Sequence, residues 1–298
     1  MLKTSLNQVL HGDLSQPEGP VVQRDGSLVV VEMSEERACL TGFDLEGNRV
    51  EIVRPGGRPT GLAVDGDGCF WVAGGAENSL VKLSPRGDLL LSIFGDEQGP
   101  FLFPNDLAFG PDGLLYMTDS GMKPDEFIKG FVIRSDFATA SYDGRVFQIE
   151  PKSGKVLKRV AGGLLFTNGI AFDAAGVLHY AETLTGKIFR HEDGRSPELF
   201  SQTPAMAINT FWGPDGMAFG ASGRLYCANY GAAHVSVFAP DGEPLEPLPT
   251  NGNRPTNVVF GNNPGELLVT EVEHGCVEIV EVGESGLPLI RPKLGLYA

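Results

Sequence analysis

The chain has 298 residues, of which 42% are hydrophobic, and its formal net charge is −15. An acidic balance of this size disfavours nucleic acid and anionic membranes as partners, and no run of about 20 apolar residues predicts a membrane helix. The N-terminal residues also lack the continuous apolar segment of a secretory signal.

The four cysteines are Cys39, Cys69, Cys227 and Cys276. Their spacing contains no CxxC pair and no zinc-binding pattern. Three of them lie in strand-like runs, which predicts buried, reduced thiols. We therefore expect a cytoplasmic protein with one domain over residues 1–298. The sequence leaves the choice between a monomer and a homodimer open.

One pattern occurs six times along the chain: a turn, a polar residue, a short apolar strand, a glycine-containing turn and a second strand. The copies span residues 17–33, 59–75, 104–120, 167–183, 214–230 and 255–272. Further strand pairs lie between them, such as residues 79–94 and 144–160. Each unit thus has about four strands, which is the composition of a propeller blade. The sequence predicts an all-β fold, a six-bladed β-propeller whose four-stranded antiparallel blades surround a central channel.

The residue at the start of the first strand differs from copy to copy. In order, these residues are Glu18, Thr60, Asn105, Asn168, Asp215 and Thr256. Because first strands line the channel of a propeller, their side chains should converge at one end of the axis. Four carry carboxylate or amide oxygens, which are ligands that Ca²⁺ prefers.

We therefore expect Glu18, Asn105, Asn168 and Asp215 to hold one Ca²⁺ ion, with Zn²⁺, Mn²⁺ or Mg²⁺ as substitutes. Water or substrate would fill the remaining coordination positions. The alternative interpretation is that these polar residues only cap turns between blades.

A second set of residues ends the second strand of each copy. They are Glu32, Gly74, Asp119, Glu182, Asn229 and Glu271. Because the two strands are antiparallel, this set should lie on the same face as the first. Asp119, Glu182 and Asn229 are candidates for orienting the metal ligands. The alternative is that they are solvated charges at the rim.

Four segments carry a resemblance to a known family over nearly the whole chain. They are Pro104-Asn105-Asp106-Leu107, Thr118-Asp119-Ser120-Gly121, Asn168-Gly169-Ile170 and Pro214-Asp215-Gly216-Met217. The sequence resembles the family of gluconolactonase, regucalcin (senescence marker protein) and luciferin-regenerating enzyme. The resemblance implies that Glu18, Asn168 and Asp215 bind a divalent metal, with Asn105 as a fourth ligand or a substrate contact. It also implies an acid/base role for Asp215.

One position departs from the sugar lactonases of that family. They often carry an arginine that reads substrate hydroxyls two residues before the third-blade asparagine, where this chain has Phe103. Phe101, Phe166, Phe211 and Trp212 lie near other positions of the first set. An apolar pocket edge that includes Phe103 would suit a less hydroxylated substrate. The alternative is that these aromatic residues pack between blades.

The third unit contains an insertion. Successive residues of the first set are 42, 45, 63, 47 and 41 positions apart, and the long interval holds residues 122–141, with Phe127, Phe131, Arg134 and Phe137. We expect this segment to emerge on the metal face as a lid, with Arg134 as a substrate contact. The alternative is an inert surface insertion.

The expected reaction is hydrolysis of a small-molecule lactone or ester. The metal would polarise the carbonyl group, and Asp215 would deprotonate the attacking water. Direct attack by Asp215 is the other route. Two further functions stay open: an organophosphate ester hydrolase that uses the same site, and a non-catalytic ligand-binding propeller with structural calcium. Arg58 and Arg254, each in an Arg-Pro-Thr triplet, would either grip an anionic substrate or be ordinary rim residues.

Overall fold

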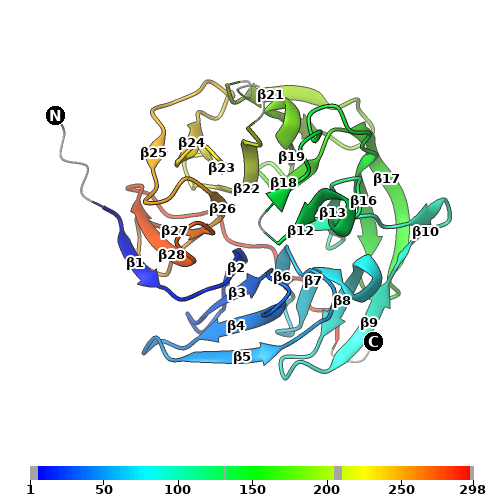
Figure 1. The fold of residues 1–298 in the computed structure, drawn as a ribbon, viewed down its shortest axis with the longest axis horizontal. Coiled ribbons are helices and arrows are strands. Elements are labelled where there is room, and N and C mark those ends of the chain that lie inside the picture. Colours follow the sequence, from blue (N-terminus) through cyan, green and yellow to red (C-terminus); the bar gives the residue numbers. More distant parts are fainter. Residues whose placement is uncertain (1–5, 131, 205–209, 296–298) are drawn as a thin grey trace.

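Six four-stranded antiparallel sheets stand around a central axis as the blades of a propeller (Figure 1). The structure is a computed structural model that describes residues 6–130, 132–204 and 210–295. The prediction of a six-bladed all-β propeller is confirmed.

The blades are numbered in chain order. Blade one has β2 (Pro17–Val22), β3 (Leu28–Glu32), β4 (Cys39–Phe43) and β5 (Arg49–Val53). Blade two has β6 (Leu62–Val64), β7 (Phe70–Gly75), β8 (Ser79–Leu83) and β9 (Leu89–Ile93). Blade three has β12 (Pro104–Phe109), β13 (Leu115–Asp119), β16 (Gly144–Glu150) and β17 (Lys155–Leu164). Blade four has β18 (Thr167–Phe172), β19 (Leu178–Glu182), β20 (Lys187–His191) and β21 (Glu198–Gln202).

The last two blades complete the ring. Blade five has β22 (Gly213–Phe219), β23 (Leu225–Tyr230), β24 (His234–Phe238) and β25 (Leu248–Pro249). Blade six has β26 (Pro255–Phe260), β27 (Glu266–Glu271), β28 (Cys276–Glu281) and β1 (Gln8–His11). Two small hairpins lie outside the blades: β10 (Gly95–Asp96) with β11 (Gly99–Pro100), and β14 (Ile128–Lys129) with β15 (Val132–Ile133).

The first strand of every blade is the innermost one, as expected. β2, β6, β12, β18, β22 and β26 contact one another in succession around the channel. The turns that lead outward use glycine where the backbone requires it. Between β12 and β13, Gly113 has φ +79°, a left-handed conformation that glycine adopts without steric cost.

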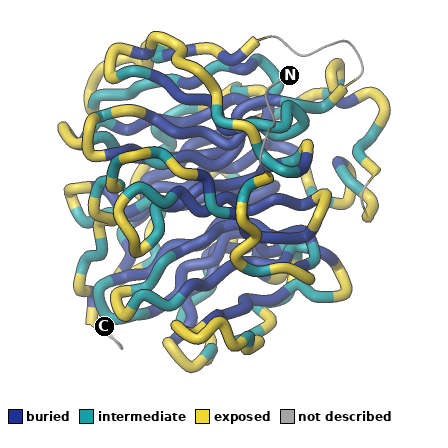
Figure 2. The backbone as a smooth tube through the Cα atoms, turned by 90° about the vertical axis from the view of Figure 1, so that its left-hand side faces the viewer, coloured by how far each residue is buried: buried dark blue, intermediate teal, exposed yellow. Residues whose placement is uncertain are grey.

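The cores lie between blades rather than within them. Val29 and Val31 pack toward Leu62 and Val72 of blade two, whereas Val30 packs with blade-six residues such as Val259. Neighbouring side chains of a strand point to opposite faces, and both faces of a blade are covered. This explains why β3 is a continuous apolar run instead of an alternating one. Figure 2 shows the buried backbone through the middle of the molecule and the exposed residues mainly in the turns.

Strand β1 closes the ring. It pairs antiparallel with β28, with Gln8 opposite Ile279 and Val9 opposite Glu278. Blade six is therefore built from both end regions of the described chain. The repeat pattern did not predict this strand.

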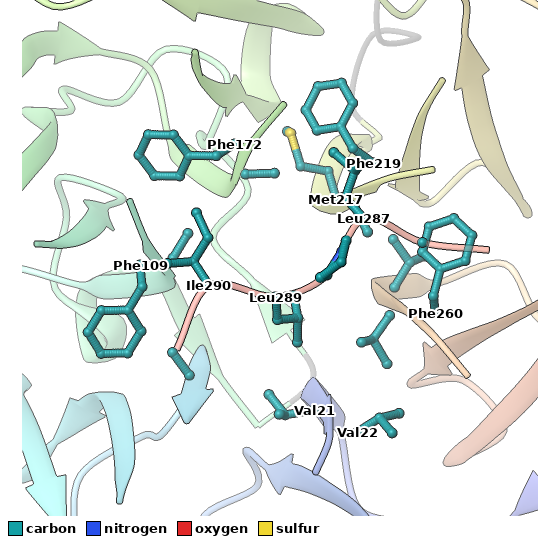
Figure 3. A pocket seen from close by; sticks show the side chains of 18 of the residues that line it. Val21, Val22, Phe109, Phe172, Met217, Phe219, Phe260, Leu287, Leu289 and Ile290 are labelled. Carbon is teal, nitrogen blue, oxygen red and sulfur yellow. The ribbon is translucent and has the colours of Figure 1, made fainter. Parts of the chain in front are cut away.

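The segment after β28 crosses the channel mouth at the ends of the inner strands. The Leu287 N–H donates to the carbonyl of Phe219 in blade five (2.9 Å), and the Gly66 N–H of blade two donates to Pro292 (2.7 Å). A cavity of about 900 Å³ lies there. Figure 3 shows Leu287, Leu289 and Ile290 running along it, among apolar side chains of the inner strands. The candidate site lies at the other ends of these strands.

Helix is minor, as predicted. Within the described ranges the helices are α1 (Pro124–Phe127), η1 (Ala76–Asn78) and η2 (Thr183–Thr185). None of these has the length and apolar run that crossing a membrane requires. All four cysteines fall in described residues, and they are buried and free of disulfides.

Candidate metal centre

Four of the predicted ligand residues meet at one cavity. Glu18, Asn105, Asn168 and Asp215 come from the starts of β2, β12, β18 and β22, and all four line a cavity of about 90 Å³. Thr60 and Thr256 complete the ring around it. All four polar side chains are buried: Glu18 is 3% exposed and Asp215 is 8% exposed.

The inner strands leave their regular register just beyond these residues. Pairing shifts between Pro104 and Leu107, and again between Pro214 and Met217. Irregularities of this kind re-aim a side chain next to a functional site. The residue after each first-set residue lies so close to the next blade that only glycine fits at several of these positions. A Cβ on Gly169 would lie 2.1 Å from the carbonyl oxygen of Asp215.

Two hydroxyl groups orient the amides of Asn105 and Asn168. Nδ2 of Asn105 donates to Oγ of Ser120 (2.9 Å), which donates to the carbonyl of Thr167 (2.9 Å). Nδ2 of Asn168 donates to Oγ1 of Thr183 (3.2 Å), which donates to the carbonyl of Pro214 (2.8 Å). Both amide nitrogens are thereby engaged in hydrogen bonds to hydroxyl groups, so the amide oxygens remain available to the cavity. Oδ1 of Asn168 is buried without a hydrogen-bond partner.

The carboxylates of the site repel one another. Oε1 of Glu18 accepts a hydrogen bond from Nδ2 of Asn257 (3.0 Å), while Oε2 is buried without a partner. Burial, followed by the charge of Asp106, raises the pKa of Glu18 to about 8. Burial also raises the pKa of Asp215 well above its usual range, and the charges of Glu18 and Asp106 add to this. A bound cation would remove the repulsion.

Asp106 is a third buried carboxylate that the sequence interpretation missed. Its Oδ1 accepts the N–H of Leu107 (2.9 Å), and its Oδ2 accepts the N–H of Ile170 (3.3 Å). Burial raises its pKa to about 6. A signal was present: the residue after each first-set residue is glycine in four copies, and the exceptions are Asp106 and Asn257. Both exceptions lie beside Glu18.

Asp119, Glu182 and Asn229 have other partners than the expected ones. Asp119 forms an ion pair with Arg145 (2.7 Å) and accepts the backbone N–H of Phe103 (2.9 Å). Glu182 accepts the N–H of Leu165 (2.7 Å).

Asn229 Nδ2 lies 3.2 Å from Oγ of Ser236. The three side chains are buried rather than solvated. In the part of the chain that the structure describes, none of them bonds to a first-set side chain. Ser120 and Thr183, which do bond to Asn105 and Asn168, come directly after Asp119 and Glu182.

An aromatic wall borders the cavity. Phe103, Phe127, Phe166 and Phe211 all line it, and Phe166 lies 4.5 Å from Phe127 and 5.3 Å from Phe211 between ring centroids. Phe101, in contrast, packs between blades against Phe147 (5.0 Å). The expected aromatic pocket edge is therefore formed by some of the predicted residues, while others belong to the core.

The insertion reaches the cavity from blade three. Its Phe127, Ile128 and Ile133 line the cavity, and the carbonyl of Gly130 accepts a hydrogen bond from Nε2 of Gln16 on the blade-one side (3.3 Å). Phe137 packs behind this layer against Phe211 (5.6 Å). Phe131 lies outside the described residues.

Arg134, the predicted substrate contact, has a partner on its own loop. Its guanidinium forms an ion pair with Asp136, two residues further on (2.7 Å). It is not among the residues that line the cavity. The short charged partner on the same loop holds the side chain at the surface.

Comparison with known proteins identifies the family of the chain. Residues 16–273 match the family described as SMP-30/Gluconolactonase/LRE-like region. The chain belongs to this family. Among SMP-30/gluconolactonase/LRE-like proteins, it is 25% identical to a gluconolactonase of Zymomonas mobilis, over 91% of this chain and 80% of that protein. The family resemblance expected from the motifs is confirmed.

Two further comparisons extend the match. The chain is 25% identical to the diisopropyl-fluorophosphatase of Loligo vulgaris, over 89% of this chain and 88% of that one. The crystal structure of a calcium-binding protein, regucalcin from Agrobacterium tumefaciens, superimposes with a TM-score of 0.76 at 19% identity, over 97% of both chains. This last likeness shows the six-bladed fold.

Proposed function

We propose that this protein is a divalent-cation-dependent hydrolase that opens a lactone, with Ca²⁺ as its cation. The observation that carries the proposal is the convergence of Glu18, Asn105, Asn168 and Asp215 on one buried cavity with an aromatic wall. Similarity to a gluconolactonase along nine-tenths of the chain supports the reaction class.

The donor set fits a hard cation. Two carboxylates and two amide oxygens are available, and Oε2 of Glu18 and Oδ1 of Asn168 are buried without partners. No cluster of three His, Cys, Asp or Glu side chains occurs in the described residues as an alternative metal site. Oxygen-only ligands suit Ca²⁺ or Mg²⁺ better than softer metals. When bound, the cation would balance the two carboxylate charges and polarise the lactone carbonyl.

The side chains of the site then have separate roles. Asp215 accepts a proton from a water molecule in the cavity, and the water oxygen attacks the carbonyl carbon of the lactone. The ring C–O bond breaks, and the proton held by Asp215 passes to the alkoxide, which yields a hydroxy acid. Asn105 and Asn168 keep their oxygens in place through Ser120 and Thr183.

The aromatic wall and the insertion define the substrate. Phe103 lies where a hydroxyl-reading group would be needed for a sugar lactone, so the substrate is a less hydroxylated lactone. Phe127, Ile128 and Ile133 of the insertion line the same cavity and would exclude water from it, as a lid does. The four buried, free cysteines suit a reducing compartment such as the cytoplasm.

A panel of γ- and δ-lactones tests the proposal. Hydrolysis is measured with native protein, after treatment with a chelator, and after addition of Ca²⁺, Mg²⁺, Mn²⁺ or Zn²⁺. We expect a loss of about 100-fold or more on chelation and recovery with Ca²⁺. A hydrolysis rate that is unchanged by the chelator would indicate a structural rather than a catalytic cation. If the cation-loaded protein hydrolyses none of the lactones, the proposed lactonase function is refuted.

Phosphoric ester hydrolysis is the second candidate, favoured by the similarity to the diisopropyl-fluorophosphatase. Diisopropyl fluorophosphate is therefore assayed beside the lactones under the same conditions. A rate above those of all lactones would reverse the order of the two functions.

A further inference from the structure

The cavity wall contains one cation, Arg58, on the loop before β6. Nη2 of Arg58 donates to Oε1 of Gln16 (2.8 Å), and Nη1 donates to the carbonyl of Met33 (3.2 Å). Its Nε is buried without a partner. Among the described residues no carboxylate forms an ion pair with it, so a half-buried guanidinium on the cavity wall has no counter-ion.

Two other blades carry an acidic residue that pairs with an arginine, at a position where blade two has glycine. At the end of the second strand, Glu32 of blade one pairs with Arg37 (3.0 Å), and Asp119 of blade three pairs with Arg145 (2.7 Å). In blade two the same position is Gly74, with φ +78°. A Cβ on Gly74 would lie 2.0 Å from the carbonyl oxygen of Arg58. The backbone of Arg58 itself therefore excludes an acidic side chain there.

Arg254 is the internal comparison, because it starts the other Arg-Pro-Thr triplet. Blade six keeps a carboxylate at the equivalent position, and Glu271 accepts the backbone N–H of Arg254 (2.9 Å). Arg254 is not among the cavity-lining residues. The two triplets thus differ in both respects: only Arg58 lines the cavity, and only Arg58 lacks an acidic residue at this position.

The Arg58 head group is also held in a fixed orientation. Gln16, which accepts from Nη2, donates through Nε2 to the carbonyl of Gly130 in the insertion (3.3 Å). Gln16 itself is 5% exposed. Burial lowers the pKa of Arg58, but an arginine stays protonated in proteins. An unpaired charge that is partly removed from water is costly, and the guanidinium, whose Nε–H has no partner, can donate to the oxygens of a carboxylate.

We propose that Arg58 is a specificity-determining residue, and that the substrate is a lactone bearing a carboxylate which pairs with its guanidinium. The inference rests on the proposed lactonase function. The lactone carbonyl lies at the Glu18–Asp215 end of the cavity, the ring lies against the aromatic wall, and the carboxylate lies at Arg58.

Two matched probes test this assignment: a γ-butyrolactone with a carboxymethyl substituent, and the same lactone with a carboxamide in its place. We expect kcat/KM to favour the carboxylate by about 10- to 100-fold. Arg58→Met should remove this preference by raising KM for the carboxylate probe, with kcat/KM for the amide probe within about threefold. Arg58→Lys should keep part of the preference. Arg86→Met, which removes an exposed arginine of the same blade, should match the native protein.

An equal kcat/KM for both probes in the native protein would overturn the assignment, as would an unchanged preference in Arg58→Met. A binding experiment separates this failure from failure of the lactonase. A γ-lactam with the same carboxymethyl group is titrated by calorimetry into native, Arg58→Met and Arg58→Lys protein. Binding that is lost in Arg58→Met supports the anion site even where no lactone is hydrolysed, and equal binding to all three refutes it.

Discussion

Nδ2 of Asn257 donates a 3.0 Å hydrogen bond to Oε1 of Glu18, joining residues 239 positions apart across the junction of blades six and one. This contact fixes one oxygen of Glu18 and directs the other into the cavity, where it has no partner. Asn257 also lies beside Asp106. One amide therefore organises two of the three buried carboxylates.

Replacing Asn257 by alanine should weaken cation binding. Without the amide, Glu18 loses its fixed orientation and Asp106 loses a hydrogen-bond donor. Outer residues that orient ligands typically change metal affinity by about 10- to 100-fold, and calorimetric titration with Ca²⁺ measures this. Asn263→Ala, in the exposed turn between β26 and β27, is the matched control. Equal affinity in both variants would contradict an orienting role for Asn257.

Asp215→Asn and Asp119→Asn should fail in different ways. Asp215→Asn removes the proton acceptor, and kcat should fall by about 10²- to 10⁴-fold at saturating Ca²⁺. Asp119→Asn removes the short ion pair of the buried Arg145 and leaves only Asp143, at 3.8 Å, which should cost about 3–5 kcal/mol of stability while kcat falls much less. Lactone kinetics and thermal unfolding of both proteins separate the two effects. A folded Asp215→Asn protein with near-native kcat would remove Asp215 from the mechanism.

The cation-free protein should lose stability as pH rises from about 5 to 8. The folded pKa of Glu18 is about 8, above its ordinary value of 4.5, so the folded state holds a proton that the unfolded chain releases. Because the folded state binds more protons in this interval, the free energy of unfolding falls with pH. Asp106 and Asp215 act in the same direction, and the total is on the order of a few kcal/mol.

Melting curves at pH 5 and pH 8, in chelator and in Ca²⁺, check this dependence. The cation should flatten it, since metal replaces the proton. Glu18→Gln should flatten the chelator curve, whereas the exposed Glu35→Gln should not. A chelated protein that is more stable at pH 8 than at pH 5 would contradict the expected sign.

Two phenylalanines of the insertion allow a test of its role. Phe127 and Phe137 are both buried, and both contact Phe211, but only Phe127 lines the cavity. Each alanine substitution should cost about 3–5 kcal/mol of stability. Phe127→Ala should also raise KM for an apolar lactone about 10-fold, while Phe137→Ala keeps KM within about twofold. Equal KM values in the two variants would leave the insertion without a role in substrate binding.

The fold and the four candidate ligand residues were predictable because they depend on a repeated local pattern. Each hairpin carries its own turn and its own inner strand, so aligning six copies also aligns Glu18 with Asp215. Strand β1 was not predictable, since its pairing with β28 is a contact between distant segments that leaves no mark in residues 8–11.

Other features of the site were less predictable, for physical reasons. Arg134 was predicted to contact substrate because of its place on the insertion, and its ion pair with Asp136 could not be foreseen from that placement. Asp106 was missed because it lies one residue beyond the aligned position, and the shifted register at Pro104–Leu107 buries Asn105 and Asp106 together. The lack of an acidic partner for Arg58 could be recognised only in the structure, because it follows from the close approach of the Arg58 carbonyl oxygen to Gly74.

Closure of the ring by β1 and β28 also bears on how the protein matures. Glu18 leaves the ribosome early, yet Asn257, which fixes its carboxylate, is synthesised more than two hundred residues later. A nascent chain that lacks the last blade therefore has the other residues of the candidate site but not the amide that orients Glu18. In the proposed function, the cation site is complete only when the newest segment has folded back upon the oldest.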